Sequence, residues 1–270
     1  MASKIIETPF LASDWLQGLG ASTAKHLLAW EQAHADELLT DVFGYHALQV
    51  GCPLLDGLRA NRMPHRWTAA TEFELSMPFE ALSAGPNRAL WMDSRAWPWP
   101  AESLDLVVLP HTLEQSADPH ACLREVERAL IPEGQVFITG INPWSLWGWR
   151  QRRFVRQRRA GGLQPALGQM LSPNRLRDWL VLLGFEVQVC HFGGWTPAFQ
   201  SDRWRKRWSW LDRLGQRWWP ILGGVYLIVA TKRVPGGRLL PSRPWRKVRS
   251  AASSTVPVAR SGARAGHSGP

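Results

Sequence analysis

A continuous apolar segment in the middle of the chain constrains the fold most. It reads LDLVVL over residues 104–109. Such a segment is typical of a strand buried on both faces, as in a parallel sheet that helices cover on both sides. Asp118 and Pro119 then predict a helix start, because a capping carboxylate is followed by proline at the first helical position. With a helix to about Leu130 and a strand over 135–139, this region predicts a right-handed β-α-β unit.

Strand and helix patterns continue on both sides of this unit. Short apolar runs alternate with segments whose apolar residues recur at helical spacing, which predicts an α/β domain. Further strands are expected at 45–50, 67–71, 89–92, 185–190 and 225–231, and further helices at 22–39, 143–160, 172–183 and 201–218.

Composition divides the chain into three expected parts. Residues 1–44 are expected to form an N-terminal helical cap and residues 45–233 the α/β domain. Two Arg- and Trp-rich insertions, 143–171 and 194–220, interrupt that domain. Residues 234–270 are rich in Pro, Gly, Ser, Ala and Arg and hold no acidic residue, so a disordered basic tail is predicted.

The net charge of +10 is distributed unevenly. Residues 1–149 carry a net charge of −9, residues 150–231 carry +10 and residues 232–270 carry +9. The basic character therefore belongs to appendages, and it is no evidence that the α/β core binds nucleic acid.

Cysteine usage and hydropathy predict a cytoplasmic protein. Cys52, Cys122 and Cys190 are too few and too scattered for a disulfide framework or a zinc motif, so no metal site is expected. The first ten residues lack the apolar segment of a signal peptide. The longest apolar run, residues 221–230, is shorter than the roughly 20 residues that cross a bilayer, and it indicates a buried strand.

Two blocks of the sequence carry a family resemblance. Residues 93–107 (DSRAWPWPAESLDLV) are similar to the pattern D-A-x-x-L-P-F-x-D-x-S-F-D-L-V, and residues 119–134 (PHACLREVERALIPEG) to P-x-x-x-L-R-E-x-x-R-V-L-K-P-G-G. Both patterns belong to the type 11-like group of class I S-adenosylmethionine-dependent methyltransferases. The resemblance extends from about Tyr45 to Val234. It implies a Rossmann-like fold with a doubly wound, mostly parallel seven-stranded sheet, and S-adenosylmethionine as the cofactor.

The glycine-rich loop of the family is altered in this chain. The family pattern after the first strand is acid-x-G-x-G-x-G, whose glycines let backbone N–H groups approach the ligand. Here residues 49–55 read QVGCPLL, so only Gly51 is kept, Gln49 replaces the acid, and Pro53 removes a backbone donor. The resemblance places Gly51 and Cys52 beside the cofactor.

The resemblance also implies two acidic contacts with the cofactor. Glu72 follows the second strand, where the family acid accepts hydrogen bonds from the ribose hydroxyls; Glu74 is a rival, and a solvated loop carboxylate is the alternative. Asp93 matches the acid that accepts from the adenine amino group, and Ser94 follows it with a backbone N–H. The alternative for Asp93 is a turn or helix cap.

The ends of the fourth and fifth strands are expected to face the methyl acceptor. Pro110 would line the cofactor, and His111 would act as a general base near neutral pH or, alternatively, as a packing residue. Residues 140–143 would line the acceptor side, or Asn142 would cap the next helix.

Tryptophan and arginine are concentrated in two segments, residues 143–159 and 203–219, in a chain with seventeen tryptophans. Three interpretations stay open for these segments. They would bind RNA through stacking and phosphate contacts, bind an anionic membrane surface, or bury tryptophan against the sheet with the arginines solvated.

Two functions follow from these features. The first is an S-adenosylmethionine-dependent methyltransferase whose acceptor the sequence does not name. The second is a catalytically inactive methyltransferase fold that serves as a binding or scaffold protein through its Arg/Trp-rich surface, with RNA, anionic lipid or a protein as its partner.

Overall fold

The computed structural model describes residues 19, 21–71, 87–160, 170–197, 207 and 210–234. The chain divides into two compact units, Met1–Val234 and Pro235–Pro270. The second unit, which holds the predicted basic tail, lies outside the described residues, as do Glu72, Glu74 and residues 203–206 of the second Arg/Trp-rich segment.

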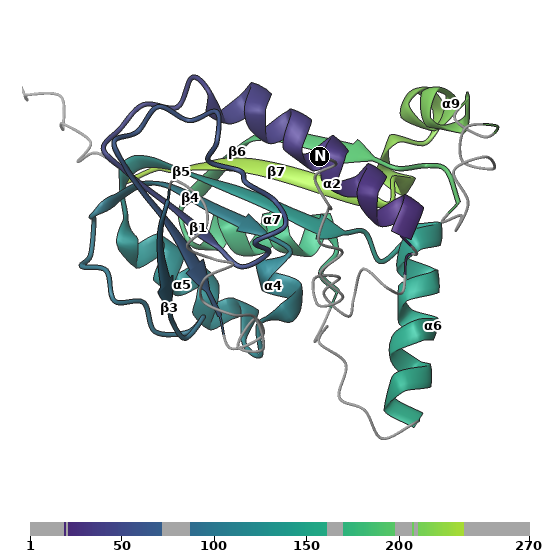
Figure 1. Ribbon diagram of the computed structural model, residues 1–270, viewed down its shortest axis with the longest axis horizontal. Coiled ribbons are helices and arrows are strands. Elements are labelled where there is room, and N and C mark those ends of the chain that lie inside the picture. Colours follow the sequence, from purple (N-terminus) through teal and green to yellow (C-terminus); the bar gives the residue numbers. More distant parts are fainter. Residues whose placement is uncertain are drawn as a thin grey trace, which may run out of the picture. The chain divides into compact units, whose positions relative to one another are not determined.

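One sheet organises the described part of the chain, and its seven strands confirm the predicted fold class (Figure 1). The strand order is β3-β2-β1-β4-β5-β7-β6. The first five strands are parallel to one another, and β7 runs antiparallel to both β5 and β6. The strands are β1 (His46–Val50), β2 (His65–Ala70), β3 (Arg88–Trp91), β4 (Leu104–Pro110), β5 (Leu130–Ile141), β6 (Phe185–Gly193) and β7 (Val225–Lys232).

Two helices, α5 and α7, begin where the capping residues predict, whereas α6 begins at Leu146, three residues later than expected. The Asp118 carboxylate accepts a hydrogen bond from the backbone N–H of Ala121 at 3.0 Å, and the Ser172 hydroxyl accepts from that of Arg175 at 3.3 Å. The helices are α2 (Ala21–Leu39), α4 (Thr112–Gln115), α5 (Pro119–Ala129), α6 (Leu146–Ala160), α7 (Pro173–Leu182) and α9 (Trp210–Trp218), with a 3₁₀ turn η1 (Pro220–Leu222).

The connection from β1 to β2 differs from the usual helical crossover of a parallel pair. Residues 51–64 form turns without a helix. The N-terminal helix α2 covers this face of the sheet instead, and its Ala35 and Leu39 share one buried cluster with Leu106 and Phe137. The helix that sequence analysis assigned to an N-terminal cap is therefore part of the core packing of the sheet.

Residues 132–134, which precede the strand expected over 135–139, already lie within β5. Glu133 has a left-handed backbone (φ 65), so the chain does turn there. The strand nevertheless starts earlier, because Leu130 pairs with Leu104 of β4 before the register shifts. Among the described residues, no helix has both the length and the apolar character needed to cross a membrane.

Candidate active site

The order of the strands reverses between β1 and β4. In open α/β sheets, ligands bind beside the carboxyl ends of the strands at such a point. Here the two strand ends are joined, because the Thr112 hydroxyl at the start of α4 donates a hydrogen bond to the Val50 carbonyl at the end of β1. The predicted site residues that follow β1 and β4 are thus brought to one edge of the sheet.

Gly51 and Cys52 form a left-handed turn directly after β1. Their φ angles are 74° and 41°, a region that glycine adopts freely and cysteine rarely. The Gly51 N–H donates to the Ala69 carbonyl of β2 at 2.8 Å, which fixes the turn at the carboxyl edge of the sheet. Gly51 and Cys52 therefore lie at the carboxyl edge of the sheet, and their contact with the cofactor stays a prediction.

The buried side chain of Gln49 holds the loop that follows. Its amide nitrogen donates to the carbonyls of Leu55 at 2.5 Å and Cys52 at 3.4 Å, and its amide oxygen accepts from the N–H of Gly57 at 2.9 Å. Leu55 and Cys52 pack in one cluster with Leu27 of α2. The residue that replaces the family acid therefore shapes a closed loop beneath α2.

Asp93 lies just beyond β3 with its carboxylate partly exposed. Arg95 donates to that carboxylate from its backbone N–H at 2.8 Å and from its guanidinium at 2.9 and 3.1 Å. These hydrogen bonds hold the pKa of Asp93 below its ordinary value. Ser94 is buried, and its hydroxyl lies 3.1 Å from that of Ser116, the residue that ends α4. Ser94 therefore links the end of β3 to the segment after β4, while Asp93 pairs within its own loop.

His111 lies in a buried cluster of charged side chains. Its Nε2 is 2.7 Å from a Glu31 carboxylate oxygen of α2, and its Nδ1 is 3.0 Å from Glu114 of α4. All three side chains are buried. Burial alone would lower the pKa of His111, but the two carboxylates outweigh it and raise that pKa to about 10. Protonated His111 donates from both ring nitrogens. It could act as a base only after losing one of these protons.

Glu114 extends this cluster to the end of β5. One of its carboxylate oxygens accepts from the Ile141 N–H at 2.5 Å. Burial raises the pKa of Glu114, and His111 opposes that shift. Burial also raises the pKa of the neighbouring Tyr226 phenol well above its ordinary value, and the charge of Glu114 adds to the effect. The cluster therefore joins α2, α4 and β5 beneath the expected acceptor side.

Sequence reasoning missed Glu31 and Glu114. Glu31 falls on the buried stripe of α2, between Leu27 and Ala35 at a spacing of four residues. A carboxylate at a core position of an amphipathic helix is a signal for a buried partner.

Pro110 is the last residue of β4 and is buried.

The central part of the chain matches a family model described as "Methyltransferase domain" over residues 48–138. The uncharacterized protein YafS of Escherichia coli strain K12 is 30% identical over 220 residues, which are 80% of this chain and 81% of YafS.

The chain belongs to the same family as YafS, and its residues 48–138 match a methyltransferase domain.

Solved structures share its fold. A complex of the Haloferax volcanii Trm112 methyltransferase activator with a putative methyltransferase matches with a TM-score of 0.55 and 16% identity, over 84% of this chain and 99% of that one. A Thermotoga maritima S-adenosylmethionine-dependent methyltransferase, described as a possible histamine N-methyltransferase, matches with a TM-score of 0.54 and 16% identity, over 81% and 93% of the chains.

The described residues fit the adenosine half of S-adenosylmethionine, the implied cofactor, well. Asp93 presents a partly exposed carboxylate at the carboxyl edge of the sheet, as an adenine contact requires. On the methionine side, Gly51 and Cys52 keep a left-handed turn in which a backbone can approach a ligand closely. The loop after that turn is closed by Gln49 and covered by α2. Glu72 follows β2, which ends at Ala70, but lies outside the described residues.

Asn142 has a structural role, but it does not cap the next helix: the Ser145 hydroxyl accepts from the Gly148 N–H at 3.0 Å at the start of α6. Its amide oxygen accepts from the Trp144 N–H at 3.1 Å, and its amide nitrogen donates to the carbonyls of Ile221 at 2.6 Å and Gly223 at 3.0 Å. Asn142 therefore holds the turn before α6 and ties it to residues 221–223, which precede β7.

The tryptophans of the first insertion divide between burial and exposure. Trp147 is buried, and its Nε1 donates to the Thr196 carbonyl at 2.6 Å. Trp144 and Trp149 are exposed. Packing against the sheet thus accounts for one of these three tryptophans and leaves the other two on the surface.

Proposed function

We propose that the chain is an S-adenosylmethionine-dependent methyltransferase whose site lies at the carboxyl ends of β1, β2, β3 and β4. The observation that carries the proposal is the joint presence of the Gly51-Cys52 left-handed turn and the partly exposed Asp93 carboxylate at this edge, within the part of the chain that matches the methyltransferase domain.

In this proposal Asp93 accepts a hydrogen bond from the adenine amino group, in place of part of its present pairing with Arg95. Ser94 and Ser116 orient that loop, and Glu72 accepts from the ribose hydroxyls. The backbone of Gly51 and Cys52 lies along the methionine part, and Pro110 lines the same edge. When bound, the cofactor supplies an electrophilic methyl group on a sulfonium.

The chain's own contribution to methyl transfer is positioning and exclusion of water. Ala24 and Leu27 of α2, together with Leu19 before it, pack in one buried cluster with Cys52 after β1 and Ile141 at the end of β5. His111 holds α2 to α4 through Glu31 and Glu114. We assign His111 a positioning role, and a base role would require its deprotonation. The methyl acceptor is an oxygen, nitrogen or carbon nucleophile on the exposed side of this edge.

Isothermal titration with S-adenosylmethionine and S-adenosylhomocysteine tests the proposal. Binding in the micromolar range is expected, and Asp93→Ala should weaken it by roughly tenfold to a hundredfold, because one hydrogen bond to a charged group is lost. Asp178→Ala is the matched control: it removes an exposed carboxylate from α7, which packs on β6 at the opposite edge of the sheet, and should leave affinity unchanged.

The closed loop beneath α2 is the observation that favours the alternative function, an inactive fold with a binding role. The absence of both titration heat and thermal stabilisation, at millimolar concentrations of both ligands, would exclude the methyltransferase. Equal affinities for wild type and Asp93→Ala would instead remove Asp93 from the site while leaving the enzyme in place.

A further inference from the structure

Large apolar side chains are exposed together at one end of the described sheet. They come from the start of α6 and from α9 with η1, and each is between 39% and 71% exposed. We name this surface the tryptophan face. It consists of Trp144, Leu146, Trp149, Trp210, Leu214, Trp218, Trp219, Ile221 and Leu222.

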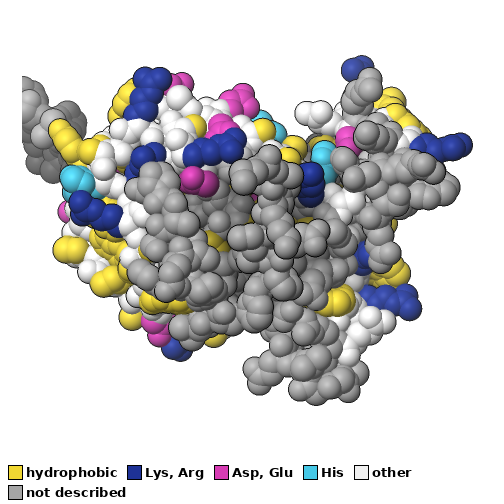
Figure 2. Space-filling view, viewed as in Figure 1, with side chains coloured by type: hydrophobic (Ala, Val, Ile, Leu, Met, Phe, Trp, Pro, Cys, Tyr) yellow, Lys and Arg dark blue, Asp and Glu magenta, His cyan; other side chains and the backbone are white. Residues whose placement is uncertain are grey.

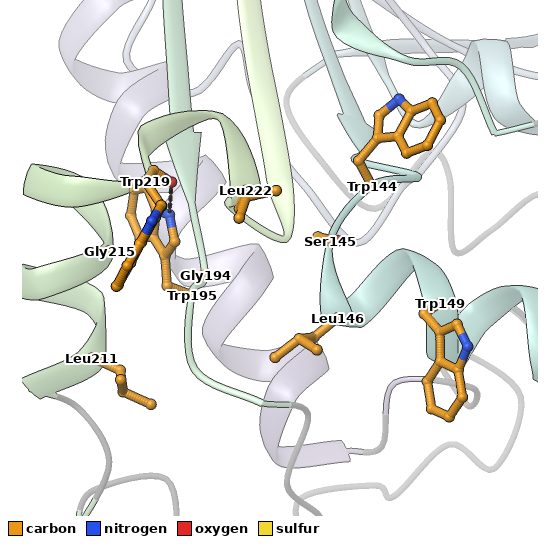
Figure 3. Close-up of a pocket in the computed structure, with 10 residues that line it drawn as sticks. All are labelled: Trp144, Ser145, Leu146, Trp149, Gly194, Trp195, Leu211, Gly215, Trp219 and Leu222. Carbon is orange, nitrogen blue, oxygen red and sulfur yellow. Dashed lines mark hydrogen bonds between the residues drawn. The ribbon is translucent and has the colours of Figure 1, made fainter.

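The two halves of the tryptophan face meet around an apolar pocket of about 360 Å³. Leu146 extends from α6 towards the side on which Leu211 and Trp219 lie, and Trp195 fills the back of the pocket (Figure 3). The Trp195 Nε1 donates to the Trp219 carbonyl at 2.9 Å. Seven of the lining residues are tryptophan or leucine with exposed or half-buried side chains, so the pocket is a continuous part of the face.

Internal hydrogen bonds hold the face in shape. Asn142 joins the turn before α6 to the carbonyls of Ile221 and Gly223. The Asp212 carboxylate of α9 accepts from the backbone N–H groups of Trp195 at 2.9 Å and Thr196 at 3.0 Å. The apolar side chains are therefore presented on a fixed support, and the acidic residue of α9 is already engaged in it.

Arginines border the exposed indoles. The Arg152 guanidinium lies 6.0 Å from the centre of the Trp144 ring, and that of Arg153 lies 5.7 Å from the Trp149 ring. Residues 143–160 contain six arginines and no acidic residue. In the space-filling view, Lys and Arg side chains lie beside hydrophobic ones over α6 and α9 (Figure 2). The charge of this region complements an anionic partner.

The mixture of aromatic and aliphatic side chains on the tryptophan face distinguishes between two anionic partners, RNA and a lipid bilayer. RNA stacks on aromatic rings and gains little from aliphatic side chains. The face exposes Leu146, Ile221 and Leu222 among its tryptophans, each about half exposed or more. The boundary of a bilayer accepts both kinds, because tryptophan is favoured at the headgroup level and aliphatic side chains favour the acyl region below it.

We propose that the tryptophan face docks on the anionic surface of a lipid bilayer, with its indole and aliphatic side chains in the headgroup region and the arginines of α6 against lipid phosphates. The contact is peripheral. It goes beyond the proposed methyl transfer, and its test requires neither cofactor nor acceptor.

Co-sedimentation of the full chain with vesicles tests the docking. Vesicles of phosphatidylglycerol and phosphatidylcholine in equal parts should bind the chain at least tenfold more tightly than vesicles of phosphatidylcholine alone. The double variant Trp149→Ala/Trp218→Ala should lose at least tenfold in affinity for the anionic vesicles, and Arg152→Gln/Arg153→Gln should lose several-fold and bind with a weaker salt dependence.

The matched control is Val181→Ala/Leu182→Ala on α7, whose side chains are as exposed as those of the face but lie outside it. It should bind as wild type does. The unfolding midpoint of every variant is measured, since a folded variant with lost binding supports the docking and full binding by the tryptophan variant overturns it.

Two further outcomes would also overturn the proposal. One is an electrophoretic shift of single-stranded RNA without any binding to vesicles. The other is loss of vesicle binding when only the Lys and Arg residues of 235–270 are replaced by Gln in the full-length chain, which would assign the contact to those residues.

Discussion

At the residue scale, a few buried polar side chains decide how the carboxyl edge of the sheet is closed. Glu31, His111 and Glu114 bring three ionisable groups out of water, which is costly unless they pair with one another. Gln49 satisfies three backbone groups of one loop. The β1–β2 connection has no crossover helix, and these side chains instead join α2, α4 and the loop after β1 by hydrogen bonds and ion pairs.

The His111 cluster predicts a pH dependence of stability. The pKa of His111 is raised from 6.5 to about 10 in the folded chain, so protonated His111 stabilises the fold fully below pH 6.5. This contribution is lost as the pH rises towards 10, by an amount on the order of a few kcal/mol. Urea unfolding between pH 6.5 and 10 should show this loss in wild type and a smaller loss in His111→Gln.

The control for that measurement is His120→Gln, an exposed histidine on α5, which should follow the wild-type pH profile. Parallel profiles of wild type and His111→Gln would mean that His111 is neutral in the folded chain.

The hydrogen bonds of Gln49 predict that replacing it with the acid of the family pattern would destabilise the loop. In Gln49→Glu a carboxylate would face the carbonyl oxygens of Cys52 and Leu55, which now accept hydrogen bonds from the amide. The free energy of unfolding should fall by about 1–3 kcal/mol. Gln157→Glu on the exposed side of α6 should leave it unchanged, and chemical denaturation compares the two.

At the element scale, α6 is attached to the sheet by one of its tryptophans. Trp147 packs against Gly194 after β6 and Gly224 before β7, where any Cβ would collide with the indole ring. Gly194 also has a left-handed backbone (φ 70), which glycine adopts without strain. The rest of α6 leads away from the sheet (Figure 1), and its Arg152, Arg153 and Arg156 are exposed.

Two tryptophans of α6 therefore have opposite expected effects on stability. Trp147→Ala should lower the free energy of unfolding by about 3–5 kcal/mol, because it empties a large buried site. Trp149→Ala, two residues further on, should change it by less than about 0.5 kcal/mol. Equal losses in denaturant unfolding would mean that Trp149 is also packed in solution.

At the scale of the whole molecule, charge and core occupy different parts of the chain. The three buried clusters of the described residues all lie between Leu19 and Ala230. Residues 235–270 add seven positive charges, and residues 1–234 alone carry a net charge of +3. The basic pI is therefore a property of the second unit and the insertions, and the stability belongs to the first unit.

This division predicts that a chain ending at Val234 keeps its fold. Its thermal unfolding midpoint should lie within about 2 °C of the full chain, because no residue of the buried clusters is removed. A fall of more than about 5 °C in calorimetry would show that residues 235–270 stabilise the first unit.

The sequence by itself determined the strands, the starts of α2, α5 and α7, and the resemblance of this protein to methyltransferases. Apolar runs and capping pairs are local signals, so β4 and the starts of α5 and α7 followed from neighbouring residues alone. The positions of Gly51 and Asp93 at strand ends followed in the same way, since each is adjacent in sequence to its strand.

Only the tertiary structure decided which side chains meet and which remain exposed. Glu31 and His111 are 80 residues apart in the chain, and no local pattern pairs them. Trp147 and Trp149 look alike in sequence, yet only Trp147 faces the glycines that leave room for its ring. Burial depends on contacts between distant segments, and these contacts exist only after the chain has folded.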